Sequence, residues 1–234
     1  REQVMACIEQ NMSPGARLLE LGCGTGIDAE YLAARGYAIQ AIDSSPAMVE
    51  RTNARLQSKG LNAHAEVLGI HEIEKLEGFF FDGAFSNLGP LNCVPDLRQV
   101  SFSLAHLLKS NGLLIASVMG RYVPWEVLYY GLRGDFRRAG VRLARTSVAV
   151  PLNGLTVWTN YYSPREFAHA FEEEFETMHV RALGLFMPPP YLIGLYDRFP
   201  RIMNMLARLD ETLGARAAFR NAGDHFLIVL RKKH

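Results

Sequence analysis

The sequence predicts an α/β fold: a doubly wound, mostly parallel sheet with helices on both faces and helical insertions. Two observations predict it. In the first two-thirds of the 234 residues, apolar strand-like runs alternate with helix-like segments, as in parallel sheets covered by helices. A glycine-rich turn, GCGTG at Gly22–Gly26, then joins the first strand to a helix. The length suits one large domain, and 49% hydrophobic residues suffice for a sizeable core.

Strands are predicted where short apolar stretches are bounded by turn residues. They are Arg17–Leu21, Ala38–Ile42, Ala63–Leu68, Phe81–Ser86, Gly112–Val118, Glu176–Leu183 and His225–Leu230. The predicted helices are about Ile27–Arg35, Pro46–Ser58, Leu97–Leu108 and a helix from Ser163. Two of them begin with a Ser-Pro pair, in which the serine can cap the helix and proline suits its first turn. Lys109–Gly112 is predicted as a helix stop and turn.

Two segments, at about 119–161 and 185–223, interrupt this alternation. We expect them to be insertions on a single domain of residues 1–234, because no repeat or low-complexity linker separates them. We call them acceptor-side insertions, since we expect them beside the site of a substrate that accepts a transferred group. The second segment begins with Pro188–Pro190 and Tyr191. It also carries an apolar stripe that is either a core helix or a wall of an acceptor site: Met203, Leu206, Leu209 and Leu213.

The first segment combines apolar residues at helical spacing with arginines. The apolar residues are Trp125, Leu128, Leu132 and Phe136, and the arginines are Arg133, Arg137, Arg138, Arg142 and Arg145. The pattern fits an ordinary surface helix packed on the domain. The alternative is that this segment is a lid, which covers a lipophilic or anionic acceptor substrate and itself touches a membrane surface.

Composition excludes several classes of protein. The net charge of +1 gives no reason to expect a nucleic-acid binder. Three cysteines without a CxxC spacing argue against a disulfide framework or zinc site and favour a cytoplasmic location. No metal is expected, because the histidines are scattered. No stretch approaches the roughly 20 apolar residues that span a bilayer, so stable membrane insertion is not expected.

The glycine turn and its nearby acids indicate a nucleotide-like ligand. Glycines at 22, 24 and 26 allow a tight turn and a close approach of a ligand to the backbone. Asp43 ends the next predicted strand, 21 residues after Gly22, at the spacing of an acid that binds ribose hydroxyls. A nicotinamide dinucleotide is one possibility, but the G-x-G-x-x-G pattern requires glycine where Ile27 stands.

Glu20 separates the two kinds of ligand. A dinucleotide places a pyrophosphate at this turn, and two like charges about 4 Å apart repel by about 4 kcal/mol at an intermediate dielectric. No lysine follows the glycines to offset that repulsion. S-adenosylmethionine carries no phosphate but a sulfonium and an ammonium, so a carboxylate at position 20 suits it.

In these motifs the sequence resembles the class I S-adenosylmethionine-dependent methyltransferases. ELGCGTG at Glu20–Gly26 is similar to their first motif, and AIDSSPAM at Ala41–Met48 to their second. FDGAFSNLGPLN at Phe81–Asn92 and LLKSNGLLIASV at Leu107–Val118 resemble the fourth and fifth strand motifs. The resemblance spans roughly residues 17–118. It implies seven strands with the last antiparallel, for which HFLIVL near the C-terminus is the natural choice.

The resemblance also implies roles for particular residues. Asp43 would bind the ribose, Met48 would cover the adenine, and Asn87 and Leu88 would meet the methionine end. One departure concerns the adenine edge, where such enzymes often carry an acid and this chain reads Gly69-Ile70-His71. The predicted cofactor-binding residues are Glu20, Gly22, Cys23, Gly24, Gly26, Asp43, Ser44, Met48, Gly69, Ile70, His71, Asn87 and Leu88.

The expected function is methyl transfer from S-adenosylmethionine to a small, partly hydrophobic acceptor, such as a phenol, a quinone-like ring or a lipid. Positioning of the reactants supplies much of such catalysis, and no catalytic base is assigned. Residues considered for the acceptor pocket are Trp125, Trp158, Tyr161, Tyr162 and His71. The alternatives are a non-catalytic S-adenosylmethionine-binding module, transfer of another group from the same cofactor, and a nicotinamide-dependent oxidoreductase.

Overall fold

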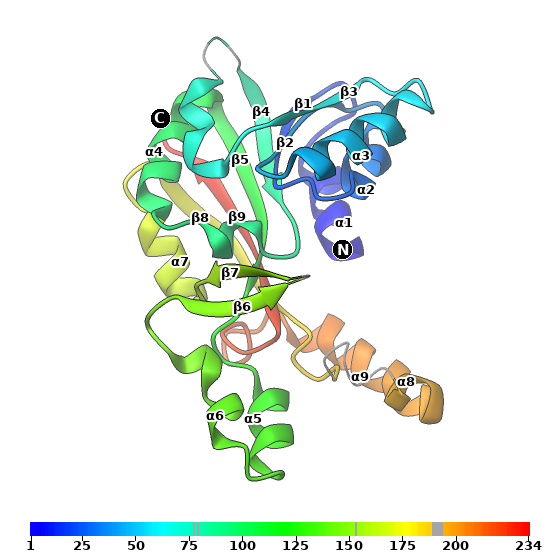
Figure 1. Cartoon of the computed structure of the whole chain (residues 1–234), viewed down its shortest axis with the longest axis vertical. Coiled ribbons are helices and arrows are strands. Elements are labelled where there is room, and N and C mark those ends of the chain that lie inside the picture. Colours follow the sequence, from blue (N-terminus) through cyan, green and yellow to red (C-terminus); the bar gives the residue numbers. More distant parts are fainter. Residues whose placement is uncertain (77, 79, 153, 189–193) are drawn as a thin grey trace.

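The structure is a computed structural model, and it describes residues 1–76, 78, 80–152, 154–188 and 194–234. A seven-stranded sheet with the order β3-β2-β1-β4-β5-β9-β8 organises it (Figure 1). Its strands are β1 (Arg17–Leu21), β2 (Ala38–Asp43), β3 (Ala63–Val67), β4 (Phe81–Ser86), β5 (Leu108–Met119), β8 (Phe175–Leu183) and β9 (His225–Lys232). Strands β1 to β5 are parallel, and β9 is antiparallel to both β5 and β8. The predicted fold class is confirmed.

Helices cover both faces of this sheet. The elements that surround it are α1 (Glu2–Asn11), α2 (Ile27–Ala33), α3 (Pro46–Gln57), η1 (Ile70–Lys75), η2 (Pro90–Cys93), α4 (Leu97–Leu107) and α7 (Pro164–Phe171). Alternation along β1 separates two buried clusters: Leu18 packs with Ile8 of α1, whereas Leu19 packs with Leu104 of α4. The sheet is therefore buried on both sides, as the doubly wound prediction requires.

The predicted helix starts are confirmed with one change. Ser163 caps α7 by accepting a hydrogen bond from the Glu166 backbone N–H, and Pro164 follows it. Pro46 begins α3 as expected, but the Ser45 side chain makes no capping hydrogen bond. Instead, the Ser45 backbone N–H donates to Asp43 Oδ1 at 2.9 Å. The start of α3 is thus tied to the acid at the end of β2.

Two local elements differ from the sequence prediction. Helix α1 was not predicted, although it packs Val4, Met5 and Ile8 into the core. The predicted turn at Lys109–Gly112 belongs to β5, which begins at Leu108 directly after α4. The pairing with β4 shifts between Phe81 and Gly83, and Asn111 has a φ of 61°. The turn residues therefore produce an irregularity within a strand and not a loop.

The first insertion contains more elements than its helical pattern predicts. It comprises α5 (Pro124–Gly131), α6 (Phe136–Ala139), η3 (Val141–Leu143) and an antiparallel hairpin of β6 (Val148–Leu152) and β7 (Leu155–Thr159). Gly131 ends α5, and Gly134 lies between the two helices. The prediction of a surface helix packed on the domain is wrong for this stripe, because Leu128, Leu132 and Phe136 are exposed.

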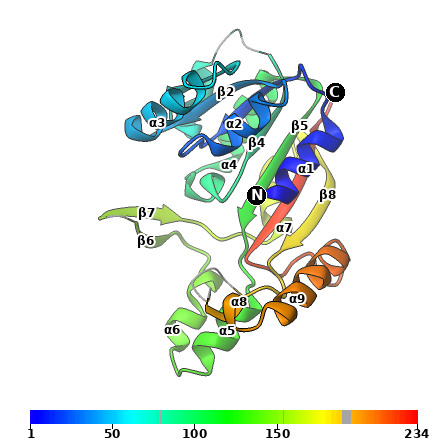
Figure 2. The ribbon, with the colours of Figure 1, turned by 90° about the vertical axis from the view of Figure 1, so that its right-hand side faces the viewer.

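The second insertion contributes α8 (Gly194–Arg198) and α9 (Pro200–Leu213). Met203 is the buried residue of the predicted apolar stripe. Asp210 is also buried on the same helix. Pro189, Pro190 and Tyr191 lie outside the described residues. Figures 1 and 2 both place α5, α6 and α8 at the end of the long axis away from α2 and α3.

Candidate functional site

A cavity of about 890 Å³ lies at the carboxyl ends of β1, β2 and β4, beside the β6–β7 hairpin. β1 pairs with β2 on one side and with β4 on the other, so the strand order reverses here. Open α/β sheets bind ligands at such a switch point. Eleven of the thirteen predicted residues line this cavity: Glu20, Gly22, Cys23, Gly24, Asp43, Ser44, Gly69, Ile70, His71, Asn87 and Leu88.

Gly26 and Met48 do not line the cavity. Gly26 has a φ of 73°, and a Cβ added there would lie 2.7 Å from the Thr52 methyl carbon. Its role is therefore to let α2 start close to α3. Met48 lies half-buried on α3.

The other two glycines of the turn also have left-handed backbones, with different surroundings. Gly22 has a φ of 84°, and a Cβ there would lie 2.4 Å from the Cβ of Pro90. Gly24 has a φ of 52°, and a Cβ there would meet no atom within 4 Å. Gly22 is thus required for packing against η2, whereas Gly24 leaves open space beside the cavity that it lines.

Asp43 fixes the glycine turn. Its Oδ2 accepts a hydrogen bond from the Gly24 N–H at 2.9 Å, and its Oδ1 accepts from the Ser45 N–H at 2.9 Å. A carboxylate has about four lone-pair directions, so each oxygen retains capacity for a further donor. The side chain joins the ends of β1 and β2 and faces the cavity that it lines.

Glu20 is 3% exposed, and its Oε2 has no hydrogen-bond partner among the described residues. Burial raises the pKa of this carboxyl well above its usual range, and Asp28 and Asp43 raise it further by repulsion, against a smaller lowering by Arg1. A buried acceptor without a partner costs free energy. The position therefore suits a cationic hydrogen-bond donor from a ligand.

Asp28 and Asn87 extend the polar side of the site. Asn87 Nδ2 donates to Asp28 Oδ2 at 2.8 Å, and Arg1 Nε lies 2.8 Å from Asp28 Oδ1. Asn87 Oδ1 is buried and has no partner among the described residues. Two unpartnered acceptor oxygens, Glu20 Oε2 and Asn87 Oδ1, thus belong to side chains of one cavity. Its lining holds three carboxylates in all, those of Glu20, Asp28 and Asp43, and one guanidinium, that of Arg1, which pairs with Asp28. This donor-poor, acidic arrangement fits an ammonium or sulfonium and not a phosphate.

Cys23 has a packing role. Burial raises the pKa of its thiol to about 12, and the sulfur lies 3.6 Å from Thr52 Oγ1. A thiol with that pKa is a poor nucleophile at neutral pH.

The opposite side of the cavity is mainly apolar. Its residues come from η2 and the segments on either side of it, from the end of β5 and from the hairpin: Leu88, Pro90, Val94, Pro95, Met119, Val150, Val157 and Thr159. Leu88 has a φ of 64°, which is rare for a residue with a side chain. Asn92 supports this side, since it accepts from the Met119 N–H at 2.9 Å and donates to the Asn160 carbonyl at 2.6 Å.

The aromatic residues considered for the acceptor pocket are placed elsewhere, whereas His71 lines the cavity. Trp125 donates its indole N–H to the Phe186 carbonyl, and Trp158 is exposed. Tyr161 lies against the Arg142 guanidinium, and Tyr162 packs edge-on against Phe167. Sequence reasoning also missed Asp28 and the hairpin valines. Asp28 could have been found as the acid that follows the glycine turn in the first turn of α2.

Among the described residues, no group of three or more His, Cys, Asp or Glu side chains is arranged to hold a metal ion. Among the same residues, no helix has both the length and the apolar composition needed to cross a bilayer.

Comparisons with known proteins agree with this geometry. Residues 18–112 match a family model described as a methyltransferase domain. A ubiquinone biosynthesis O-methyltransferase of Xylella fastidiosa is 32% identical over 107 residues, which are 46% of this chain and 43% of that protein. Over this part the chain is similar to S-adenosylmethionine-dependent methyltransferases. It spans less than half the length of the curated relatives it matches.

Solved structures share the methyltransferase fold over the whole chain. A SAM-dependent methyltransferase of Methanosarcina mazei superposes with a TM-score of 0.65 at 19% identity and covers 97% of each chain. A (4+2)-cyclase, SpnF, superposes with a TM-score of 0.62 at 15% identity over 99% of this chain and 81% of its own. The fold of this family is therefore also present in a protein named for different chemistry, and the site must carry the argument for activity.

Proposed function

We propose that the chain is an S-adenosylmethionine-dependent methyltransferase that moves a methyl group to a small, partly hydrophobic acceptor. The observation that carries the proposal is the buried, unpartnered Glu20 Oε2 in a cavity lined by three carboxylates. A site of this charge repels a pyrophosphate and attracts a cation. The same observation disfavours a nicotinamide dinucleotide.

Particular residues fit parts of this cofactor. Asp43, at the end of β2, has acceptor capacity for ribose hydroxyls. Glu20 Oε2 and Asn87 Oδ1 have acceptor capacity for the ammonium of the methionine end. Ile70 and His71 lie on the lining where the adenine edge is expected, and Gly24 leaves room for close approach. When bound, S-adenosylmethionine supplies a methyl group activated by a sulfonium leaving group.

The protein's contribution to transfer would be positioning and exclusion of water. The apolar side formed by Pro90, Met119, Val150 and Val157 would hold the acceptor against the polar side. Holding two reactants in place can supply roughly 7–11 kcal/mol of the barrier. The curated relatives are named as ubiquinone biosynthesis O-methyltransferases, which supports an acceptor with a hydroxylated, quinone-like ring.

We also propose that residues 1–234 form one methyltransferase domain with acceptor-side insertions at 119–161 and 185–223. The first insertion supports this, because its hairpin lines the cavity. A cytoplasmic location is proposed with it, since Cys7, Cys23 and Cys93 are free thiols.

A thermal-shift titration tests the cofactor. Wild type, Asp43→Asn and the exposed-site control Glu50→Gln are titrated with S-adenosylmethionine, S-adenosylhomocysteine and NADH. Ligand at a hundredfold its Kd adds about 2.7 kcal/mol, or roughly 5–10 °C in Tm for a chain of this size. We expect a shift with both adenosyl ligands that is lost in Asp43→Asn and kept in Glu50→Gln. A shift with NADH alone would overturn the proposal.

A transfer assay tests the reaction. Radiolabelled methyl groups from S-adenosylmethionine are followed into phenols, quinols, lipids, amines and peptides. Transfer to a ring hydroxyl supports the proposal. Cofactor binding without transfer to any acceptor class would favour the binding module, and transfer to a polar amine or peptide alone would overturn the hydrophobic acceptor.

A further inference from the structure

In the segment 124–145, here called the α5–α6 tip, an acid is buried while large apolar side chains are exposed. Glu126 is the buried residue of α5, at 8% exposure. Large apolar side chains that follow α5 are exposed: Leu132 is 81% exposed and Phe136 is 75% exposed. Val127, Leu128 and Leu143 are exposed on the same segment. Helices that cover a core bury their apolar residues, so this segment is not explained by packing on the domain.

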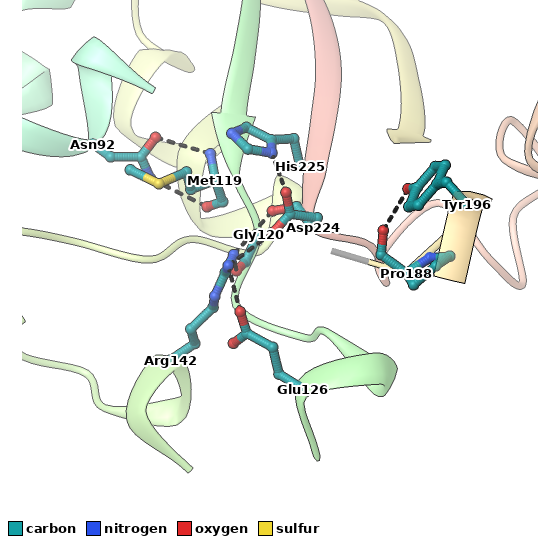
Figure 3. A network of polar contacts seen from close by, with 9 residues as sticks. All are labelled: Asn92, Met119, Gly120, Glu126, Arg142, Pro188, Tyr196, Asp224 and His225. Carbon is teal, nitrogen blue, oxygen red and sulfur yellow. Dashed lines mark hydrogen bonds and ion pairs between the residues drawn. The ribbon is translucent and has the colours of Figure 1, made fainter. Parts of the chain in front are cut away.

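Buried ion pairs hold the tip in this orientation. Arg142 Nη2 lies 2.7 Å from Glu126 Oε1 and 2.7 Å from Asp224 Oδ1, at the start of β9 (Figure 3). Arg142 also donates to the carbonyl oxygens of Gly120 and Asp224. The charged side of α5 is thereby fastened to the end of the sheet, and its apolar side is left facing outward.

The tip is also strongly basic. Its five arginines and two acids give it a formal charge of +3, whereas the whole chain has +1. Arg133, Arg137, Arg138 and Arg145 are exposed around the apolar side chains. Arg133 stacks on Tyr129 with its guanidinium 3.6 Å from the ring centre. Exposed apolar and aromatic side chains surrounded by arginines are typical of surfaces that lie in a lipid headgroup layer.

We propose that the α5–α6 tip is a docking surface for an anionic phospholipid bilayer. The exposed apolar side chains would enter the headgroup and acyl boundary, and the arginines would contact the lipid phosphates. Figures 1 and 2 place the tip at the extreme end of the long axis, so a flat surface can reach it without contacting the body. Its charge favours an anionic membrane over a second copy of this basic tip.

The hairpin relates this surface to the cavity. β6 follows the tip directly in the chain, and Val150 and Val157 line the cavity while Leu155 and Trp158 are exposed. The hairpin thus connects the docked surface with the apolar side of the cavity, which a lipophilic acceptor held in the bilayer would enter. This last step rests on the proposed function, whereas docking itself does not.

Vesicle sedimentation tests the docking. Wild type is mixed with vesicles of phosphatidylcholine alone or of phosphatidylcholine and phosphatidylglycerol in equal amounts, at low and high salt. The tip variants are Leu132→Ser/Phe136→Ser and Arg137→Glu. The matched controls are Val67→Ser/Phe102→Ser and Arg51→Glu, which change exposed residues of the body. Because all of these side chains are exposed, we expect each variant to fold, and circular dichroism checks this.

We expect wild type to bind the anionic vesicles, with weaker binding at high salt. Leu132→Ser/Phe136→Ser should weaken partition at least about tenfold, and Arg137→Glu about fivefold or more. The controls should bind like wild type. Equal binding to neutral vesicles, or equal loss in the controls, would overturn the proposal. So would absence of vesicle binding together with a dimer, in sedimentation velocity, that the double tip variant abolishes.

The same samples are titrated with S-adenosylmethionine. Vesicle binding without a thermal shift would leave the docking surface standing and would overturn only the proposed function. A thermal shift without vesicle binding would leave the proposed function standing and would overturn the docking surface.

Discussion

Arg142 and Asp224 are 82 residues apart in sequence and form a 2.7 Å ion pair that fastens the first insertion to the start of β9. The same guanidinium nitrogen binds Glu126 at 2.7 Å, so one arginine compensates two largely buried carboxylates (Figure 3). The pair lies next to Gly120, whose N–H donates to the Asp224 carbonyl at 2.9 Å. The position of the α5–α6 tip and the end of β5 therefore depend on the same few contacts.

Replacing Arg142 should destabilise the chain. Arg142→Met leaves Glu126 and Asp224 without their cation, and breaking a buried pair in this way costs about 3–5 kcal/mol. Urea unfolding measures the loss. The control is Arg145→Met, which removes an exposed arginine of the same segment and should change stability little. Equal effects of the two substitutions would contradict a structural role for the ion pairs.

Acid should weaken this attachment. Burial raises the pKa of Asp224, but the hydrogen bond from His225 and the Arg142 guanidinium outweigh burial and lower it to about 2. A carboxyl with a folded-state pKa below its unfolded value of 3.8 stabilises the fold above that value, and the contribution disappears as pH falls to about 2. The depression corresponds to about 2 kcal/mol.

The measurement compares the pH dependence of unfolding in wild type and Asp224→Asn. Wild type should lose stability more steeply than the variant as pH falls from 4 towards 2. Parallel curves for the two proteins over that range would show that Asp224 is not stabilised by its partners.

The glycines of the turn should separate stability from binding. Gly22→Ala places a Cβ 2.4 Å from Pro90 and should lower Tm strongly, because both side chain and backbone must shift. Gly24→Ala meets no atom within 4 Å. Its cost should be about 1–2 kcal/mol from the left-handed backbone alone, yet it should reduce adenosyl-ligand binding. Thermal melts with and without ligand distinguish the two effects, and unchanged binding by Gly24→Ala would count against a ligand beside the turn.

Glu20→Gln should stabilise the free protein and weaken cofactor binding. The folded-state pKa of Glu20 lies above its unfolded value, so ionisation costs stability as pH rises above about 4.5. A neutral amide removes that cost. It also removes a charged acceptor for the cofactor's cation, worth about 1.5–3 kcal/mol, or roughly tenfold to a hundredfold in Kd.

Binding of S-adenosylmethionine to wild type should tighten as pH rises, because the cation favours the ionised form of Glu20. Calorimetry across pH measures this, with Glu50→Gln as the control for the substitution. A pH-independent Kd in wild type, with no loss in Glu20→Gln, would remove Glu20 from the site.

The polar side of the site was largely predictable because its signals are local. The three glycines of the turn lie within five consecutive positions, and Asp43 ends β2 at a fixed distance along a βαβ unit. Met48 was expected over the adenine from its motif position but lies outside the cavity lining. A helix periodicity gives the face of a residue only approximately, and the packing of α3 decided its direction.

The sequence by itself determined the alternation of strands and helices, the glycine turn and the acids beside it. Each of these follows from short-range periodicity and backbone sterics. Only the tertiary structure decided where the insertions go. The direction in which α5 faces depends on Arg142 meeting Asp224 across 82 positions, and the apolar side of the cavity depends on a hairpin that folds back onto η2. Such contacts are set by packing between distant segments, which no local pattern in the chain encodes.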